Sequence, residues 1–453
     1  MSNSSKLGDR PIPALLFQQS LPAFIGILSI SVYNVVDAIF VGQFVGSLGI
    51  AAIAVVLPIT FLIGALGMSI GVGGASIIAR AFGSNRPERA HTAFGNQIMM
   101  TLTLAVVFVA LGIVFQDAIL SAFGGKGDIL LPAREYFNAI IWGIPFLAWS
   151  MMSNNVIRAE GQAKVAMMTM IIPALFNIIL DPIFIVWLDM GMRGAGTATA
   201  ISYTASAAFA LGYFLFGRSE LELRLRNIVF DAGIVAEITS IGFVTFARQG
   251  MISLLAIVLN NTLFRYGGEM AVSAYGIINR LMMFIISPII GITQGFVPIA
   301  GFNFGARQYS RLREVIRLAM LSGSAISAVI FIILFAFTEP LIKVFTRDAE
   351  LIALTKPALR TVFALTPLIA IQLIGPAYYQ ATGRALPALF LTLTKQGFFL
   401  IPLVLLMPLA YGLDGTWWSF PIADLLSAVV VLTAVVISVR NLPADGTPAG
   451  NAR

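Results

Sequence analysis

The sequence predicts an all-α integral membrane protein with about twelve transmembrane helices, in two six-helix bundles related by a pseudo-twofold axis along the membrane normal. Three observations favour this class. The 453 residues are 58% hydrophobic and only 11% charged. The apolar residues form long uncharged runs, and motifs of the first half recur in the second. Because soluble domains are about 25% charged, a soluble globular protein is excluded.

The apolar runs set the number of helices. A helix needs about 20 mostly apolar residues to cross the hydrocarbon core of a bilayer. The runs that meet this requirement lie near 14–40, 50–76, 93–116, 134–155, 165–188, 194–216, 235–263, 270–300, 317–338, 357–378, 386–410 and 416–439. The mean hydropathy of +0.92 shows that such runs fill most of the chain.

The charged loops set the orientation. When loops are assigned alternately to the two sides, one side holds roughly twice as many lysines and arginines as the other, and positive loops favour the cytoplasm. Both termini are therefore predicted to be cytoplasmic, with the protein in the plasma membrane, or inner membrane, as a multi-pass protein. The basic residues behind the net charge of +7 lie in these short loops, so no nucleic-acid partner is expected.

Several kinds of chemistry are excluded by residue counts. The chain has no cysteine, which removes thiolate metal sites and disulfides. Its one histidine, His91, lies in a polar loop. Intramembrane metalloproteases and many lipid-modifying enzymes need histidines or clustered acids, so we expect no enzyme, no cofactor and no resident metal.

Repeated motifs divide the chain into two halves. Ala-Phe-Gly at 81–83 corresponds to Asn-Phe-Gly at 303–305, and Arg158-Ala-Glu-Gly-Gln-Ala corresponds to Gln380-Ala-Thr-Gly-Arg-Ala, both 222 residues apart. Gly191 and Gly194 match Gly412 and Gly415 at 221. The expected organisation is an N-terminal lobe at 1–216, a cytoplasmic linker at 217–233, a C-terminal lobe at 234–440 and a disordered cytoplasmic tail at 441–453.

One acid is placed where a bilayer should exclude it. Asp37 is the only charged residue between Arg10 and Arg80. A carboxylate at the centre of a membrane helix costs about 2.5–3.5 kcal/mol on insertion scales, and such residues usually serve transport. Tyr33 lies one turn before Asp37 on the same helix face, with Asn34 adjacent. Asp37 is therefore the predicted site of the coupling ion.

Further polar residues of the first half supply candidate partners. Asn177 and Asp181 lie one turn apart, although Asp181 also suits a role at a helix end because Pro182 follows it. Tyr136, Asn154 and Thr199 offer additional oxygens or donors. The position that matches Asp37 in the second half is Leu259. Ion coupling is therefore expected in the first half.

The second half carries a different set of polar residues. Arg248, Gln249, Asn260 and Arg280 are candidates for lining a cleft, although the two arginines also suit snorkelling toward the membrane surface. Lys395 and Asp424 suit a structural ion pair. Pro22 lies fifteen residues before Asp37 in the same run and either permits a kink or starts the regular helix.

The repeat, the segment Tyr-Asn-Val-Val-Asp-Ala-Ile-Phe-Val-Gly at 33–42, the loops after Gly83 and Gly305, and Arg158-Ala-Glu-Gly-Gln together resemble the multidrug and toxic compound extrusion (MATE) family. The lone acid in the first helix is similar to the DinF-like branch. Later helices offer Gln249 and Gln372 where other branches have acids.

The resemblance implies an antiporter that exports amphipathic, often cationic organic compounds in exchange for inward protons. Sodium is the rival coupling ion. The resemblance also implies a polar network that binds the coupling ion, and this network falls on Asp37, Asn177, Asp181 and Thr199. The residues that surround it are Tyr33, Tyr136 and Asn154. A hinge in the first helix falls on Pro22. Sodium would use the oxygens of the same four network residues.

The remaining expectations concern partners and a second function. Small organic substrates and membrane lipid are the expected partners, and twelve spans suffice for a working monomer. The alternative function is a flippase for a lipid-linked precursor, for which Arg248 and Arg280 offer some of the positive charge that a pyrophosphate group needs.

Overall fold

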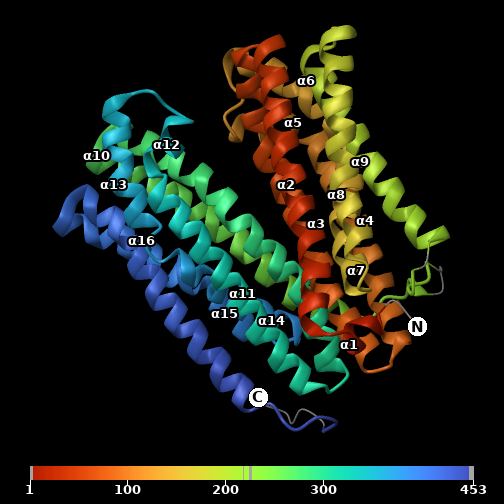
Figure 1. Cartoon of the computed structure of the whole chain (residues 1–453). Coiled ribbons are helices and arrows are strands. Elements are labelled where there is room, and N and C mark those ends of the chain that lie inside the picture. Colours follow the sequence, from red (N-terminus) through yellow and green to blue (C-terminus); the bar gives the residue numbers. More distant parts are fainter. Residues whose placement is uncertain (1–3, 218, 224–226, 448–453) are drawn as a thin grey trace. The chain divides into compact units, whose positions relative to one another are not determined.

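The computed structural model describes residues 4–217, 219–223 and 227–447, and most of these residues are helical, with no β-strand among them. Figure 1 shows the long helices in chain order. Their bounds are α1 (Lys6–Asp9), α2 (Ile12–Phe44), α3 (Ser47–Gly83), α4 (Pro87–Val114), α5 (Gln116–Ala122), η1 (Gly127–Ile129), α6 (Leu130–Ile140), η2 (Ile141–Gly143), α7 (Ile144–Ala159), α8 (Ala163–Asp181), η3 (Pro182–Trp187), α9 (Gly191–Phe216), α10 (Ala232–Gly305), α11 (Tyr309–Ala336), α12 (Thr338–Lys343), α13 (Ala349–Val362), η5 (Thr366–Leu368), α14 (Ile369–Ala381), α15 (Ala385–Leu393), η6 (Thr394–Leu400) and α16 (Ile401–Arg440).

The helices account for the predicted membrane crossings. Within the described residues, nine continuous helical stretches are long and apolar enough to cross a membrane, or ten with the bent pair Ala349–Val362 and Thr366–Ala381. Two of these stretches, Ala232–Gly305 and Ala385–Arg440, have 74 and 56 residues. Each contains a residue with non-helical backbone, Gly268 or Gly412. Each is long enough for two crossings, so the prediction of an all-α protein with about twelve spans is confirmed.

The backbone repeats as the sequence motifs do. Gly46, between α2 and α3, has φ +93°, and Gly268, 222 residues later, has φ +63°. Left-handed backbone is accessible to glycine at little cost, so these two residues let the chain reverse between successive helices. The same spacing relates three further pairs with positive φ, namely Asn85 and Arg307, Gly161 and Gly383, and, at 221, Gly191 and Gly412.

The chain forms two compact units that exchange short segments. The first unit holds the described residues up to Asp9 and Leu21–Thr245, and the second holds Arg10–Ser20 and the described residues from Phe246 onward. The start of α10 thus packs in the first unit, whereas the sequence placed it in the C-terminal lobe. The reason is close packing of α10 on α3: a Cβ on Gly73 would meet the Ile238 carbonyl oxygen at 2.2 Å, and one on Gly242 would meet that of Ser69 at 2.4 Å.

The start of α2 packs in the second unit, although the rest of α2 belongs to the first. A Cβ on Gly295 would lie 2.5 Å from Ser20 Oγ, so α2 begins against the second half of α10. Arg311 also donates to the Arg10 carbonyl oxygen at 2.7 Å. The two exchanged segments, at 10–20 and 232–245, begin 222 residues apart and therefore follow the repeat.

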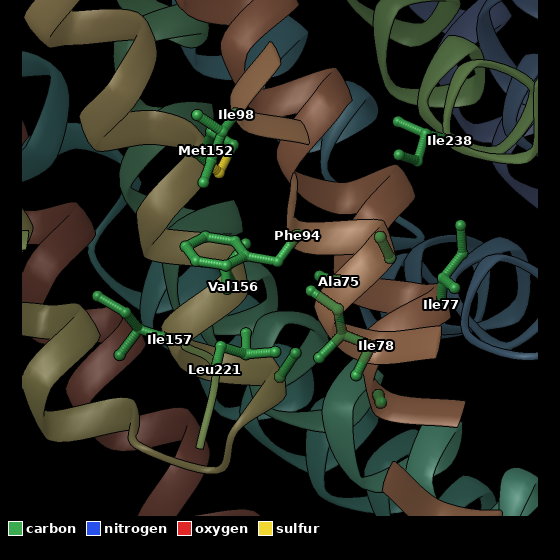
Figure 2. Packing of buried hydrophobic residues seen from close by; sticks show 14 of the residues in the cluster. Ala75, Ile77, Ile78, Phe94, Ile98, Met152, Val156, Ile157, Leu221 and Ile238 are labelled. Atoms are coloured by element: carbon green, nitrogen blue, oxygen red, sulfur yellow. The ribbon is translucent and has the colours of Figure 1, made fainter. Parts of the chain in front are cut away.

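The core of the first unit joins α3, α4 and α7 to the linker. Figure 2 shows Ile78, Phe94 and Val156 packed together, with Leu221 beside them. Phe94 also packs on Phe214 with ring centroids 4.7 Å apart. Leu221 is 1% exposed, so this part of the predicted linker is fixed to the helices by apolar burial; the linker residues 218 and 224–226 lie outside the described residues.

A buried carboxylate also holds the linker. Glu160 follows the last turn of α7 and is fully buried. It accepts hydrogen bonds from Tyr213 Oη at 2.8 Å, Ser219 Oγ at 2.7 Å and the backbone N–H groups of Glu220 and Leu221 at 2.8 and 3.0 Å. Burial raises the pKa of Glu160 to about 7, although these donors oppose the rise.

Stability should depend on pH through Glu160. Its pKa is about 7 in the folded protein against an ordinary value of 4.5 for glutamate, so between these pH values the folded state retains a proton that the unfolded state releases. Stability should therefore fall as pH rises through this window. Glu160→Gln keeps an acceptor and should remove this pH dependence. Glu160→Ala should cost about 1–3 kcal/mol for each buried donor that it leaves unpaired.

Thermal unfolding in detergent between pH 5 and pH 8 measures this effect. The control is Glu222→Gln, which changes an acid of the same linker without changing Glu160. A melting temperature of the Glu160→Gln protein that falls with pH as steeply as the wild type would contradict the assignment.

The predicted disordered tail is wrong for residues 441–447. Asp445 accepts hydrogen bonds from the Ser310 backbone N–H at 2.8 Å and the Ser310 hydroxyl at 2.5 Å. Arg313 donates to the Leu442 carbonyl oxygen at 2.6 Å. Charge-assisted hydrogen bonds to the start of α11 therefore order this segment, despite its Pro, Gly and Ala content. The tail residues 448–453 lie outside the described residues.

Candidate functional site

The centre of the candidate site is formed by the end of α8 and the middle of α9. Asn177 Nδ2 donates to Asp181 Oδ1 and to Thr199 Oγ1, both at 3.3 Å. Asn177 and Asp181 lie one turn apart on α8, as their spacing predicts. All three residues are buried, with Asp181 fully inaccessible. The structure therefore brings together three of the four predicted network residues through hydrogen bonds from a single amide.

Close helix packing brings a tyrosine to the same place. A Cβ on Gly196 would lie 2.6 Å from the Tyr136 carbonyl oxygen, so only glycine lets α9 approach α6 this closely. Thr199 lies one turn beyond Gly196 and shares a hydrogen bond with the Tyr136 side chain. Tyr136 is thus a neighbour of the network, as predicted.

Asp37 completes the group from α2. Its carboxyl group lies within hydrogen-bonding reach of the Asp181 carboxyl group. Tyr33, one turn earlier on the same helix, shares a hydrogen bond with Tyr203. The four predicted coupling residues therefore lie together in the first unit.

The two carboxylates have no positive partner in the described part of the chain. Asp37 Oδ1, Asp181 Oδ2 and Asn177 Oδ1 are buried and, among those residues, accept no hydrogen bond. Two adjacent carboxylates in a desolvated setting cannot both stay ionised without a cation. The geometry therefore suits one exchangeable positive charge, carried either by a proton or by a sodium ion held by carboxylate, amide and hydroxyl oxygens.

Two predicted supporting residues lie elsewhere. Asn154 is separate from the acid pair: its Nδ2 donates to the Ala166 carbonyl oxygen at 2.7 Å and to Thr169 Oγ1 at 2.8 Å, and its Oδ1 accepts from Arg158 Nε at 3.0 Å. Its amide joins α7 to α8, which corrects its assignment to the surroundings of the network. Asn34 is exposed on α2.

One residue of the site was missed from the sequence. Tyr203 contacts Tyr33 and lies close to Asp37 and Tyr136. It follows Thr199 by four residues on α9, so it occupies the same helix face. The sequence contains a signal that could have identified Tyr203, namely its spacing of four residues from Thr199.

The second unit contains a different polar group. Lys395 Nζ lies 2.6 Å from Asp424 Oδ1, which confirms the predicted pair. Gln372 Nε2 donates to the same oxygen at 3.0 Å and to the Asp424 carbonyl oxygen at 2.9 Å. Of the predicted cleft candidates, Arg248 is half-buried, and Gln249, Asn260 and Arg280 are exposed.

These features define a class: a multi-pass membrane protein with a duplicated six-helix architecture and a buried acid pair in its first half. The comparisons give the family. The MatE family model matches residues 22–183 and 245–406, and the chain belongs to the MatE family of membrane transporters. The resemblance read from the sequence is confirmed, and its DinF-like branch stays a prediction.

Individual relatives match over nearly the whole chain. The multidrug export protein MepA of Staphylococcus aureus (strain MSSA476) is 28% identical over 435 residues, covering 96% of each chain. A solved structure described as the outward-facing conformation of a multidrug resistance MATE family transporter has a TM-score of 0.91, with 25% identity and coverage of 97% of this chain and 98% of that chain. A crystal structure of MATE in the bent conformation gives the same values.

Proposed function

We propose that the protein exports amphipathic, often cationic organic compounds from the cytoplasm in exchange for inward-moving protons. The observation that carries this proposal is the buried pair Asp37 and Asp181, whose oxygens Oδ1 and Oδ2 accept no hydrogen bond from the described residues. The names of the relatives, a multidrug export protein and a multidrug resistance transporter, support the substrate class.

The proton acts through the contacts of the pair. In the outward-open form a proton binds at Asp37 and is shared with Asp181. Neutralisation removes the repulsion between the carboxyl groups and changes the hydrogen bonds that Asn177 makes to Asp181 and Thr199. Substrate leaves outward, and the proton is released after the protein opens to the cytoplasm. Each charge that crosses the field gains about 2.3 kcal/mol per 100 mV.

Bending of α2 couples this chemistry to movement. α2 continues from Ile12 to Phe44 through Pro22, and its packing changes from the second unit to the first between Ser20 and Leu21. A proline removes one backbone hydrogen bond and permits a kink. A bend at Pro22 would therefore move Asp37 while the first turns of the helix stay in place. The solved relative in a bent conformation supports such a change.

The flippase alternative is not favoured. The curated relative described above is a multidrug export protein, and Lys395 is already paired with Asp424. The described part of the second unit therefore offers less free positive charge than a pyrophosphate group would need.

Purified protein in liposomes separates the two coupling ions. Vesicles that are acidic inside and free of sodium should take up a fluorescent organic cation, since a tenfold proton gradient supplies about 1.4 kcal/mol per proton. A sodium gradient at equal pH should drive no uptake. Uptake driven by sodium alone would assign the acid pair to sodium, and uptake that ignores both gradients would contradict antiport.

A further inference from the structure

The interior of the second unit has more positive than negative side chains at one depth. Lys395 lies in η6 and Arg248 in α10. These two segments touch, because a Cβ on Gly397 would lie 3.5 Å from Met251 Sδ. Arg248 is one turn before Met251, and Lys395 is two residues before Gly397. Both cations therefore lie within about one turn of the same helix contact.

The acid at this depth is already occupied. Asp424 Oδ1 receives Lys395 at 2.6 Å and Gln372 Nε2 at 3.0 Å. Asp424 is 3% exposed, so little of it remains for another donor. Within residues 4–217, 219–223 and 227–447, no ion pair or hydrogen bond engages the Arg248 guanidinium. Arg248 therefore lacks a negative partner in the part of the chain that the structure describes.

Arg248 lies well inside the apolar part of α10, away from the charged end of this helix. Glu237, on the same helix, binds Arg80 and Arg89 at 2.8 and 2.7 Å and marks the charged end of this helix. Arg248 lies about 16 Å further along at 1.5 Å per residue, whereas the hydrocarbon core is about 30 Å thick. A guanidinium at this depth is costly without a partner, which indicates that a ligand supplies the negative charge.

The local backbone also suits a binding site. η6 (Thr394–Leu400) is a π-helix, and such segments often occur at functional sites. Within this segment Lys395 lies 2.6 Å from Asp424, and Gly397 lies against α10 without a side chain. A guanidinium next to this segment presents donors that match a carboxylate in a bidentate way.

We propose that Arg248 anchors an oxyanion subsite in the second unit, which takes the carboxylate of an amphipathic organic substrate. The inference rests on the proposed export function. It adds to the proposed substrates those amphipathic compounds that carry a carboxylate as well as apolar rings. A carboxylate on a small molecule fits better than a lipid phosphate, because lipid phosphates lie at the surface of the hydrocarbon core and Arg248 lies about 16 Å along its helix from the charged end.

Two dyes that differ in one group test the subsite. Tetramethylrhodamine with a free carboxylate and its methyl ester share one ring system, and fluorescence anisotropy measures their binding to the full chain in phosphatidylcholine nanodiscs. Arg248→Gln should weaken binding of the free acid about ten- to a hundredfold, as expected for a lost charge-assisted hydrogen bond. Binding of the ester should change less than about twofold. Arg248→Lys should retain part of the affinity for the acid.

A matched control is Arg265→Gln, which removes an arginine of the same helix that lies over the Tyr266 ring at 5.6 Å. It should change binding of neither dye. Because Arg248 has no described partner, Arg248→Gln should also keep or raise the melting temperature. A lowered melting temperature would show a structural partner and overturn the proposal.

Three further results would overturn the subsite. The first is failure of the wild type to bind the free acid. The second is an equal loss of affinity for both dyes in Arg248→Gln. The third is displacement of the free acid by phosphatidylglycerol in the wild type but not in Arg248→Gln, which would assign the bound oxyanion to lipid. The export function is judged separately by proton-driven uptake of the ester. If the ester is transported and the acid binds unchanged without Arg248, only the subsite fails.

Discussion

Replacing Asp37 with asparagine should reduce proton-driven uptake to the level of vesicles without protein. The amide has nearly the same shape as the carboxyl group but cannot gain or lose a proton near neutral pH. Asp181 would then lack the neighbour with which it shares the positive charge, so substrate movement would no longer be linked to the pH gradient. Uptake of a fluorescent organic cation into liposomes that are acidic inside measures the effect.

The fold should survive the Asp37→Asn change. Asp37 Oδ1 accepts no hydrogen bond from the described residues, and removing one of two adjacent carboxylates relieves repulsion. The melting temperature in detergent should therefore stay the same or rise. Asp117→Asn is the matched control, because Asp117 is an exposed acid that pairs with Arg134 at 2.8 Å. Proton-driven uptake by Asp37→Asn at the wild-type rate would refute the role of the acid pair.

Breaking the buried pair of the second unit should cause the largest loss of stability. Asp424→Asn leaves the ammonium group of Lys395 without a counter-charge, and removing one partner of a buried pair typically costs about 3–5 kcal/mol. The double change Lys395→Met with Asp424→Leu removes both charges and should restore much of that loss, since apolar replacement of a buried pair is often neutral. Unfolding in detergent, followed by temperature or denaturant, gives the comparison.

The exposed pair Arg134–Asp117 provides the reference for that experiment. Its side chains are 42% and 64% exposed, and exposed pairs contribute about 0–1 kcal/mol. Asp117→Asn should therefore change stability little. If Asp424→Asn costs no more than this, the pair is not a structural element of the second unit.

The sequence predicted the helices well because membrane crossings depend on length and hydropathy, which are local properties. It also identified Asp37, since a single carboxylate in a long apolar run is conspicuous. Asn177 and Asp181 followed from helical spacing along one helix. Tyr136 and Thr199 lie in different helices, and their meeting depends on Gly196, which allows α9 to approach α6. Such a contact between helices cannot be read from spacing within either one.

The errors have physical causes of the same kind. Asn154 is a polar residue in an apolar helix, as the coupling residues are, but its amide joins α7 to α8 through Ala166 and Thr169. The composition of residues 441–447 suggested disorder, yet Asp445 and the carbonyl oxygen of Leu442 bind the start of α11. The exchange of segments between the two units depends on the close approaches at Gly73, Gly242 and Gly295. Sequence patterns carry none of this partner information.

The left-handed residues that recur in both halves have a consequence for how such a protein can evolve. Gly46 and Gly268 turn the chain at corresponding points, and three more pairs do the same. Because these joints are fixed by backbone conformation, the side chains between them were free to diverge without loss of the architecture. One copy now holds two acids, and the other holds a lysine paired with an acid and a half-buried arginine. The duplicated architecture therefore allowed the two halves to acquire different buried charges.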